Sequence, residues 1–368
     1  MIDDPAPVSA TPGRVNQAEF LAGLPEGSSV LIVRLRSLGD TILLTPSLRL
    51  LHNWRPDLSL SVLLDPPWDA LLGGNPCVQS ILKSRGKLAT LRQIRNRKFS
   101  CIINLHGGPT SALFTRWSGA TKRAVFAHFR NTSAYSTLVP TAQEILGRTG
   151  PVHTAEHVAS CFFWLGLPVS EIPAAEIFPD QDARARVGKA LHTYGIQPGK
   201  PYAVIHPTAT YETKRWNASG FAEMAAYLKN KYDLPSVFLC MREEEEVLNE
   251  VEKSASWPLP RAVDWPLQDV MALISGAKIF LGNDSGPAHV AAAARIPVAV
   301  IFGSSNSTTW KPWQAIDSAV IQNEFACNPC AGDRCREYGE PRCILSITAE
   351  QVKGSVDSLL PTESISSI

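Results

Sequence analysis

Short apolar runs alternate with segments of helical periodicity along the whole chain. Apolar runs bounded by turn residues predict buried strands, and apolar residues that recur every three to four positions predict helices. In the first half, the expected strands are 30–33, 58–64, 78–82, 101–105 and 123–126. The expected helices there are 17–24, 41–52, 68–72, 87–98, a segment ending at 117, and 153–165, whereas 128–152 shows no clear period.

The same alternation restarts after residues 168–179, which hold three prolines and little periodicity. Strands are expected at 202–205, 237–239, 279–281 and 298–302, with edge strands near 262 and 320. Helices are expected at 182–194, 221–232, 244–253, 267–277 and 348–360. Alternation at this spacing means βαβ crossovers and parallel sheets. Occurring twice around a proline-rich linker, it predicts an α/β protein with two Rossmann-like domains that face a central cleft.

The length of 368 residues is enough for two domains, each with its own core. We expect the following division: a mobile N-terminal tail (1–28), a first domain (29–167), a linker (168–179), a second domain (180–346) and a C-terminal helix with its tail (347–368). The C-terminal helix can pack on either domain.

Composition narrows the class of partner. Hydrophobic residues make up 45% of the chain and charged residues 19%, as in soluble globular proteins. A formal net charge of +1 argues against the strongly basic surface that is typical of nucleic-acid-binding proteins. An anionic partner must therefore bind at a local site. No apolar run reaches the ~18 residues of a membrane span, and 1–29 lacks the pattern of a secretory signal. We expect a cytoplasmic protein, with peripheral contact to the inner face of the membrane left open.

A polar turn follows the expected strand 279–281. Asp284, Ser285, Gly286 and His289 lie between that strand and a helix of small residues. In open α/β sheets, ligands bind at the carboxyl ends of strands, where N–H groups of a helix start face anionic groups. Gly286 permits close approach of the backbone to a phosphate. The alternative is a tight turn in which Asp or Ser only caps the helix.

A second turn of this kind follows the expected strand 30–33. Ser37 and Asp40 lie in it with a glycine, and this position places the Asp40 carboxylate at the predicted cleft. Arg34 and Arg36 beside it suit an anionic acceptor. The alternatives are that Asp40 caps the following helix and that the arginines are ordinary surface charges.

Two further segments carry hydroxyls and charges at expected helix starts. Segment 206–216 holds Thr208 and Lys214, which can cradle a phosphate, although no Walker A pattern is present. Segment 241–246 holds four glutamates, most of which complement the helix dipole. One of them can accept hydrogen bonds from ribose hydroxyls, and Glu243, nearest the strand end, is our choice. Solvated loop charges are the alternative for Lys214.

These segments, in this order and at these spacings, resemble glycosyltransferase family 9, the heptosyltransferases of lipopolysaccharide core synthesis. The resemblance covers about 30–360. It implies a GT-B fold and an inverting, metal-independent transfer of a sugar from a nucleotide-diphosphate donor, with ADP-heptose as the best candidate. The acceptor implied is a lipid-linked or oligosaccharide glycan of the bacterial cell envelope.

The resemblance also implies a role for each segment. Asp40 becomes the general base, which such a transfer needs to deprotonate the acceptor hydroxyl. No cofactor is required, because a lysine and a helix start can meet the charge on the leaving group. The acceptor side would consist of Arg34, Arg36 and Ser37. The donor side would consist of Thr208 and Lys214 at the diphosphate, Glu243 at the ribose, and Asp284, Ser285, Gly286 and His289 along the pocket.

The eight cysteines fall into two groups. Four lie in apolar segments and are expected to be buried thiols: Cys77, Cys101, Cys161 and Cys240. The others are clustered with the spacing C-x2-C-x4-C-x7-C, namely Cys327, Cys330, Cys335 and Cys343. This cluster indicates either a structural zinc site or free, redox-active thiols. A DxD motif, Asp180 to Asp182, is expected to cap the next helix rather than to bind a metal ion.

Two other classes of function stay open. One is a nucleotide-sugar epimerase of the same architecture, which would interconvert free donor without an acceptor. The other is a nucleotide-sugar-binding module without turnover, in which Asp40 only caps a helix.

Overall fold

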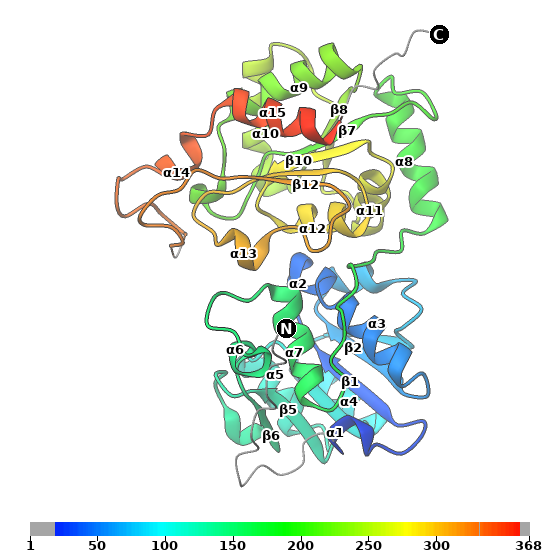
Figure 1. The fold of residues 1–368 in the computed structure, drawn as a ribbon. Coiled ribbons are helices and arrows are strands. Elements are labelled where there is room, and N and C mark those ends of the chain that lie inside the picture. The colour runs from blue at the N-terminus through cyan, green and yellow to red at the C-terminus, as the bar shows by residue number, and fades with distance from the viewer. Residues whose placement is uncertain (1–18, 331, 361–368) are drawn as a thin grey trace, which may run out of the picture.

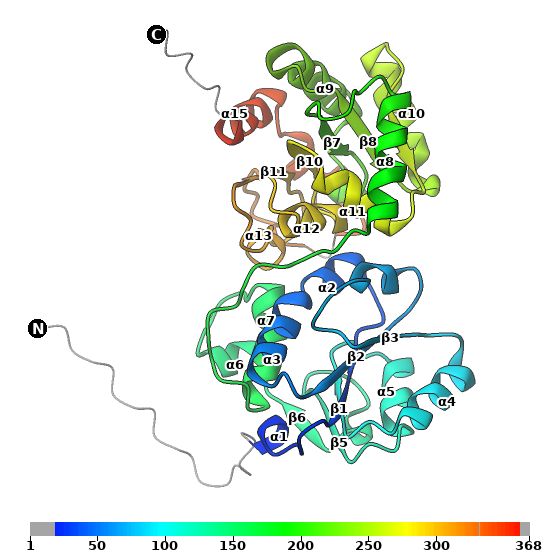
Figure 2. The same cartoon turned by 90° about the vertical axis from the view of Figure 1, so that its right-hand side faces the viewer.

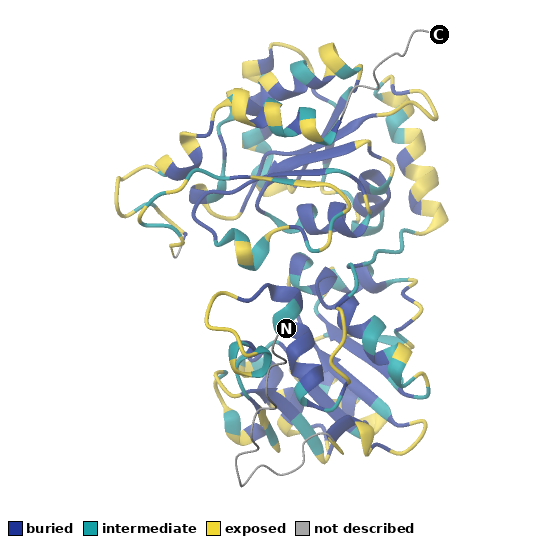
Figure 3. Cartoon of the chain, in the orientation of Figure 1, coloured by how far each residue is buried: buried dark blue, intermediate teal, exposed yellow. Residues whose placement is uncertain are grey.

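The computed structural model describes residues 19–330 and 332–360. These residues form two six-stranded sheets, one in each half of the chain, in which neighbouring strands are all parallel (Figure 1). Helices cover the sheets, and the central strands are buried between them, whereas the edge strands β3, β6, β9 and β12 are partly exposed (Figure 3). The α/β class and the parallel sheets predicted from the alternation are confirmed.

The first sheet has the order β3-β2-β1-β4-β5-β6. Its strands are β1 (Ser29–Val33), β2 (Ser59–Leu64), β3 (Ser80–Lys83), β4 (Cys101–Asn104), β5 (Lys122–Phe126) and β6 (Thr137–Val139). The helical segments of this half are α1 (Glu19–Ala22), α2 (Leu38–Ile42), α3 (Thr45–Trp54), η1 (Trp68–Leu72), α4 (Lys87–Arg97), α5 (Pro109–Arg116), η2 (Thr132–Ala134), α6 (Ala142–Leu146) and α7 (Thr154–Trp164).

The second sheet has the order β12-β11-β10-β7-β8-β9. Its strands are β7 (Ala203–His206), β8 (Ser236–Cys240), β9 (Arg261–Val263), β10 (Ile279–Asn283), β11 (Val298–Ile301) and β12 (Ser318–Ile321). The helical segments are α8 (Gln181–Thr193), η3 (Glu212–Lys214), α9 (Ala218–Tyr232), η4 (Arg242–Glu244), α10 (Glu245–Ala255), α11 (Leu267–Ser275), α12 (Gly286–Ala293), α13 (Ser307–Trp310), α14 (Arg342–Leu345) and α15 (Ala349–Leu359).

Several local expectations change in the structure. The helix expected at 41–52 is two helices, because Pro46 occupies the first turn of a new helix, α3, where its missing N–H costs no hydrogen bond. Part of the predicted tail is packed: Phe20 and Leu21 are buried in the first core, and the Leu21 N–H donates to the Leu165 carbonyl at 3.0 Å. The segment 128–152, without clear period, holds β6 and α6.

The two halves meet where α2 packs against α12 (Figure 2). A Cβ on Gly39 of α2 would lie 2.8 Å from the His289 ring, and one on Gly286 of α12 would lie 3.0 Å from the Leu38 side chain. Both glycines are therefore needed for the close approach of these helices. Ile42, from the first half, is buried in the apolar cluster of the second half.

The segment predicted as the linker, 168–179, lies in a stretch without helix or strand that runs between the two sheets (Figure 2). The C-terminal helix α15 packs on the second sheet, against β11 and β12 and beside α9. The four scattered cysteines are all buried, as expected.

Asp180 caps α8, because its Oδ1 accepts a hydrogen bond from the Ala183 N–H at 2.6 Å. The capping role predicted for the first carboxylate of the DxD motif is confirmed. Asp182 is the second residue of the helix, in its first turn, and is exposed.

Asp180→Ala is expected to lower the free energy of unfolding by about 1 kcal/mol, since it removes this cap. Asp182→Ala is the matched control and should change it by less than about 0.5 kcal/mol. Chemical denaturation of both variants measures the difference. Equal effects of the two substitutions would contradict the cap.

Candidate active site

Asp40 is held by its own turn and by Arg34. The turn Ser37 to Asp40 leaves the carboxyl end of β1 and enters α2, and Asp40 Oδ2 accepts from the Ser37 N–H at 3.3 Å and from its hydroxyl at 3.1 Å. Arg34 forms an ion pair with Asp40 Oδ1 and also donates to the Leu105 carbonyl. Asp40 therefore lies inside α2 at its third position, and Ser37, not Asp40, is the N-cap residue. Both oxygens of the Asp40 carboxylate are therefore held in place, at the carboxyl edge of the first sheet.

Asn283, the last residue of β10, and Asp284, in the turn that follows, connect the segments that form the second half of the site. Asn283 accepts from the Trp216 N–H at 3.1 Å and donates to the Pro207 carbonyl at 2.8 Å, which fixes both ends of the loop between them. Asp284 is buried and accepts from Lys214 Nζ at 2.8 Å. The turn thus delivers Lys214 to the carboxyl edge of the sheet.

A chain of hydrogen bonds links Ser285 to Glu244 across the adjacent strands β10, β7 and β8. Thr208 donates to Glu244 Oε2 at 2.7 Å, so its oxygen accepts from His206 Nε2 at 3.2 Å. His206 Nδ1 is then the acceptor that faces the Ser285 hydroxyl at 3.1 Å. Burial lowers the pKa of His206, which favours this neutral form of the ring.

Two placements differ from the prediction. Glu243 is exposed and is not among the residues that line the Lys214 cavity, whereas the half-buried Glu244, the last residue of the short helix η4, lines it. Thr208 is fully buried and donates to Glu244, so it does not open into the cavity where a diphosphate would lie. Its position supports Glu244 instead.

Two cavities meet at this site. The Asp40 cavity, about 760 Å³, is lined by residues that include Arg34, Arg36, Asp40, His106 and His157. The Lys214 cavity, about 680 Å³, is lined by residues that include Lys214, Glu244, Asp284, Ser285, Gly286 and His289. Ser37 and Trp310 line both. Chemistry at the junction can therefore involve one molecule from each side.

The lining of the Lys214 cavity also includes large apolar side chains. They include Trp68, Met241, Trp265 and Leu267. Flat indole rings and a thioether suit an aromatic base, while Lys214 in the same lining suits phosphates. The segments of His206, Met241 and Glu244 are among those singled out from the sequence, without a role for these side chains. Trp68, Trp265, Leu267 and Trp310 are not predicted from the sequence, because only the folded chain brings their segments to this cavity.

His289 lies at the contact between the two halves. It is buried against Gly39, and its Nδ1 has no hydrogen-bond partner among the described residues. Burial lowers the pKa of His289 to about 4, although the Asp284 carboxylate opposes the shift. The packed contact between α2 and α12 therefore favours the neutral form of the His289 ring over the protonated form.

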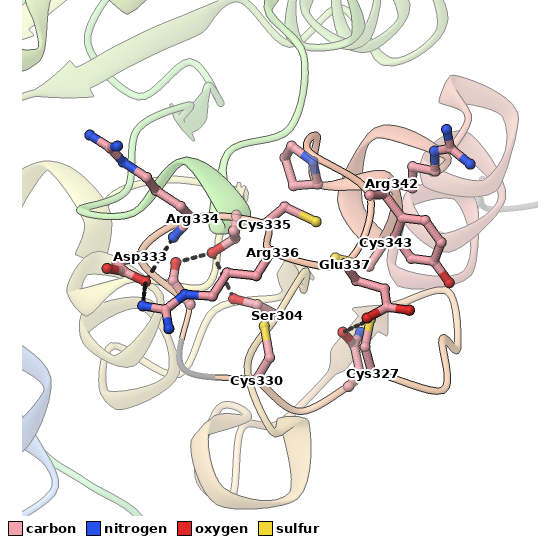
Figure 4. Close-up of a pocket in the computed structure, with 15 residues that line it drawn as sticks. Ser304, Cys327, Cys330, Asp333, Arg334, Cys335, Arg336, Glu337, Arg342 and Cys343 are labelled. Atoms are coloured by element: carbon pink, nitrogen blue, oxygen red, sulfur yellow. Dashed lines mark hydrogen bonds and ion pairs between the residues drawn. The ribbon is translucent and has the colours of Figure 1, made fainter.

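The four clustered cysteines line a separate cavity of about 190 Å³ (Figure 4). All four are free thiols, and burial raises the pKa of Cys343. Across 19–330 and 332–360, no three His, Cys, Asp or Glu side chains are placed to hold a metal ion. The described side chains thus form no ready metal site, and the structural zinc stays a prediction without a preformed ligand set.

A family model described as glycosyltransferase family 9 (heptosyltransferase) matches residues 87–339, more than half of the chain. The chain belongs to glycosyltransferase family 9. It is therefore a glycosyltransferase, and its two Rossmann-like halves have the GT-B fold that the resemblance implied. Within the part of this family 9 enzyme that the structure describes, each helix is too short or too polar to cross a membrane.

Individual relatives agree with this assignment. Lipopolysaccharide heptosyltransferase 3 of Escherichia coli is 26% identical over 345 residues, covering 88% of this chain and 97% of that protein. A family 9 glycosyltransferase structure from Veillonella parvula has a TM-score of 0.78 at 20% identity and covers 91% of this chain and 97% of that one. The iron-containing heptosyltransferase TibC of enterotoxigenic E. coli, solved with ADP-D-beta-D-heptose, has a TM-score of 0.56 at 17% identity and covers 92% and 77%.

The lowered pKa of His289 makes stability depend on pH. Between about pH 4 and the ordinary pKa of 6.5, the His289 ring is protonated in the unfolded chain and neutral in the folded enzyme. The free energy of unfolding therefore falls as the pH falls. His289→Gln should reduce this slope by about 1 kcal/mol per pH unit. Urea unfolding at about pH 5 and about pH 7 measures it, with the exposed His192→Gln as control. An unchanged slope in His289→Gln would refute the assignment.

Proposed function

We propose that this glycosyltransferase moves heptose from ADP-heptose to a lipopolysaccharide core or similar surface glycan. The observation that carries the proposal is the junction of the Asp40 cavity and the Lys214 cavity at Ser37. A donor in one cavity and an acceptor in the other would place their reacting atoms beside Asp40. The heptosyltransferase relatives support the choice of sugar and acceptor.

In the proposed reaction, Asp40 accepts the proton of an acceptor hydroxyl. The hydroxyl oxygen attacks the anomeric carbon, and the bond to the diphosphate breaks with its electron pair moving to the phosphate oxygen, which inverts the configuration. Ser37 and Arg34 fix the two carboxylate oxygens and so orient the base. Arg36, exposed at the same cavity, is free to meet an anionic group on the acceptor.

Lys214 and the start of α12 would stabilise the diphosphate as it leaves. Lys214 is 2.8 Å from Asp284 and faces the cavity, so a diphosphate can share its ammonium charge. The first N–H groups of α12, at Gly286, add positive potential at the same edge. Glu244 takes over the ribose contact first proposed for Glu243. The proposal invokes no metal ion in the transfer.

The acceptor cavity favours transfer over epimerisation of free donor. An epimerase needs room for one nucleotide sugar, which the Lys214 cavity alone supplies. The Asp40 cavity adds a second space with two arginines, which suits a separate anionic glycan. Because such a glycan is lipid-linked, we place the reaction in the cytoplasm, at the inner face of the membrane.

Asp40→Asn is expected to lower kcat by about 10²- to 10⁴-fold, since the amide keeps the shape but cannot take the proton. Affinity for ADP should stay within about twofold, because donor binding lies in the other cavity. The exposed Asp182→Asn is the matched control. A kcat within about threefold of the parent would remove Asp40 as the base.

Lys214→Ala is expected to weaken ADP binding by about tenfold to about a hundredfold, because a charge-assisted hydrogen bond is worth about 1.5–3 kcal/mol. Calorimetric titration measures it. The double variant Lys214→Ala/Asp284→Asn removes the buried carboxylate that the single change leaves unpaired, so it separates loss of binding from a folding defect. Affinity within about twofold of the parent in both variants would overturn the role of Lys214.

A further inference from the structure

Basic residues are concentrated in one stretch of the first domain. Residues 70–143 hold 11 lysines and arginines and no aspartate or glutamate. The rest of the chain holds 24 basic and 34 acidic residues. The net charge of +1 therefore hides a strongly positive segment within an otherwise acidic protein, and such a field attracts anionic partners.

Seven of these cations lie on or next to α4 and α5, two helices that contact each other at the edge of the first domain (Figure 2). All seven are exposed: Arg85, Lys87, Arg92, Arg95, Arg97, Lys98 and Arg116. Within the described residues none of them forms an ion pair, so their charge is uncompensated. We call this surface the basic face.

Large apolar side chains stand among these cations. Leu88 is 84% exposed, Trp117 57% and Leu113 37%. The opposite sides of the two helices are anchored, since Ile94 and Phe114 are buried in a core cluster with strand residues of the first sheet. Arg95 also donates to the Trp117 carbonyl at 3.3 Å, which joins the helices at that end. The exposed leucines and indole are thus presented on a rigid support.

We propose that the basic face docks this enzyme on an anionic lipid bilayer. Lysine and arginine beside an anionic membrane each add to binding, while leucine and tryptophan insert at the boundary between headgroups and acyl chains. A nucleic acid would also meet the cations, but it would leave Leu88 without a partner. The choice of a membrane rests in part on the proposed function, whose acceptor is lipid-linked.

The placement of the basic face relative to the site agrees with this partner. His106, which lines the Asp40 cavity, lies three residues before the start of α5. The basic face and the proposed acceptor cavity therefore belong to the same domain and are joined through one turn. Docking would hold the first domain at the membrane that carries the acceptor, while the donor half faces away from it.

The test is sedimentation of the full chain with vesicles, which requires neither donor nor acceptor. The protein is expected to bind phosphatidylcholine vesicles with about one third phosphatidylglycerol, and to bind pure phosphatidylcholine at least about tenfold more weakly. Raising the salt from about 50 mM to about 300 mM should release it. Because no turnover is measured, failure here is distinct from failure of the proposed function.

The variant Lys87→Gln/Arg92→Gln/Arg95→Gln should lower vesicle affinity by about tenfold or more, and Leu88→Ser by about threefold or more. The matched control, Arg184→Gln/Lys189→Gln/Lys200→Gln, removes three exposed cations from the second domain and should bind like the parent. Transfer to a water-soluble acceptor should stay unchanged in the Leu88 and triple variants.

Three results would overturn the proposal. The first is equal vesicle binding by the parent and the Lys87/Arg92/Arg95 variant. The second is equal binding to charged and uncharged vesicles. The third is tighter binding of single- or double-stranded nucleic acid than of vesicles at the same salt, lost in the same variant, which would assign the basic face to a nucleic acid.

Discussion

The close contact of α2 with α12 is the constraint on which the site depends. Each helix begins at the carboxyl edge of its own sheet, and each offers a glycine where the other brings a side chain: Gly39 faces His289, and Gly286 faces Leu38. A larger residue at either glycine would push the edges apart. Asp40 lies one residue beyond the first of these contacts, so the packing of two helices sets the distance between Asp40 and the turn that follows β10.

The charges of the site are already paired without a substrate. Asp40 pairs with Arg34, and Asp284 pairs with Lys214. Asp284 is buried and Asp40 is partly buried, so either carboxylate would be costly without the cation that pairs with it. A donor diphosphate and an anionic acceptor would then share cations that are already in place, and little reorganisation would be needed. The ion pairs therefore prepare the site as well as stabilise it.

Periodicity predicted most of the strands because both sheets are buried on both faces, and parallel strands of this kind read as short apolar runs. It could not give the strand order, so it could not show that β10, β7 and β8 end side by side. Glu243 is nearer the strand end, but it is Glu244 that accepts the hydrogen bond from Thr208 and lines the Lys214 cavity, and periodicity alone does not predict that difference. The short strand β6 was missed, since three residues carry too little pattern.

The net charge of the chain does not show how its charges are distributed along the sequence. A value of +1 argues against an electrostatic partner only if the charges are mixed, and here the structure separates them. α4 follows β3 and α5 follows β4, and the exposed cations on and next to these helices line neither of the two cavities of the site. One domain thus carries two kinds of positive charge: Arg34, which is paired with Asp40, and the unpaired cations of the basic face. Only the second kind remains free for a partner outside the active site.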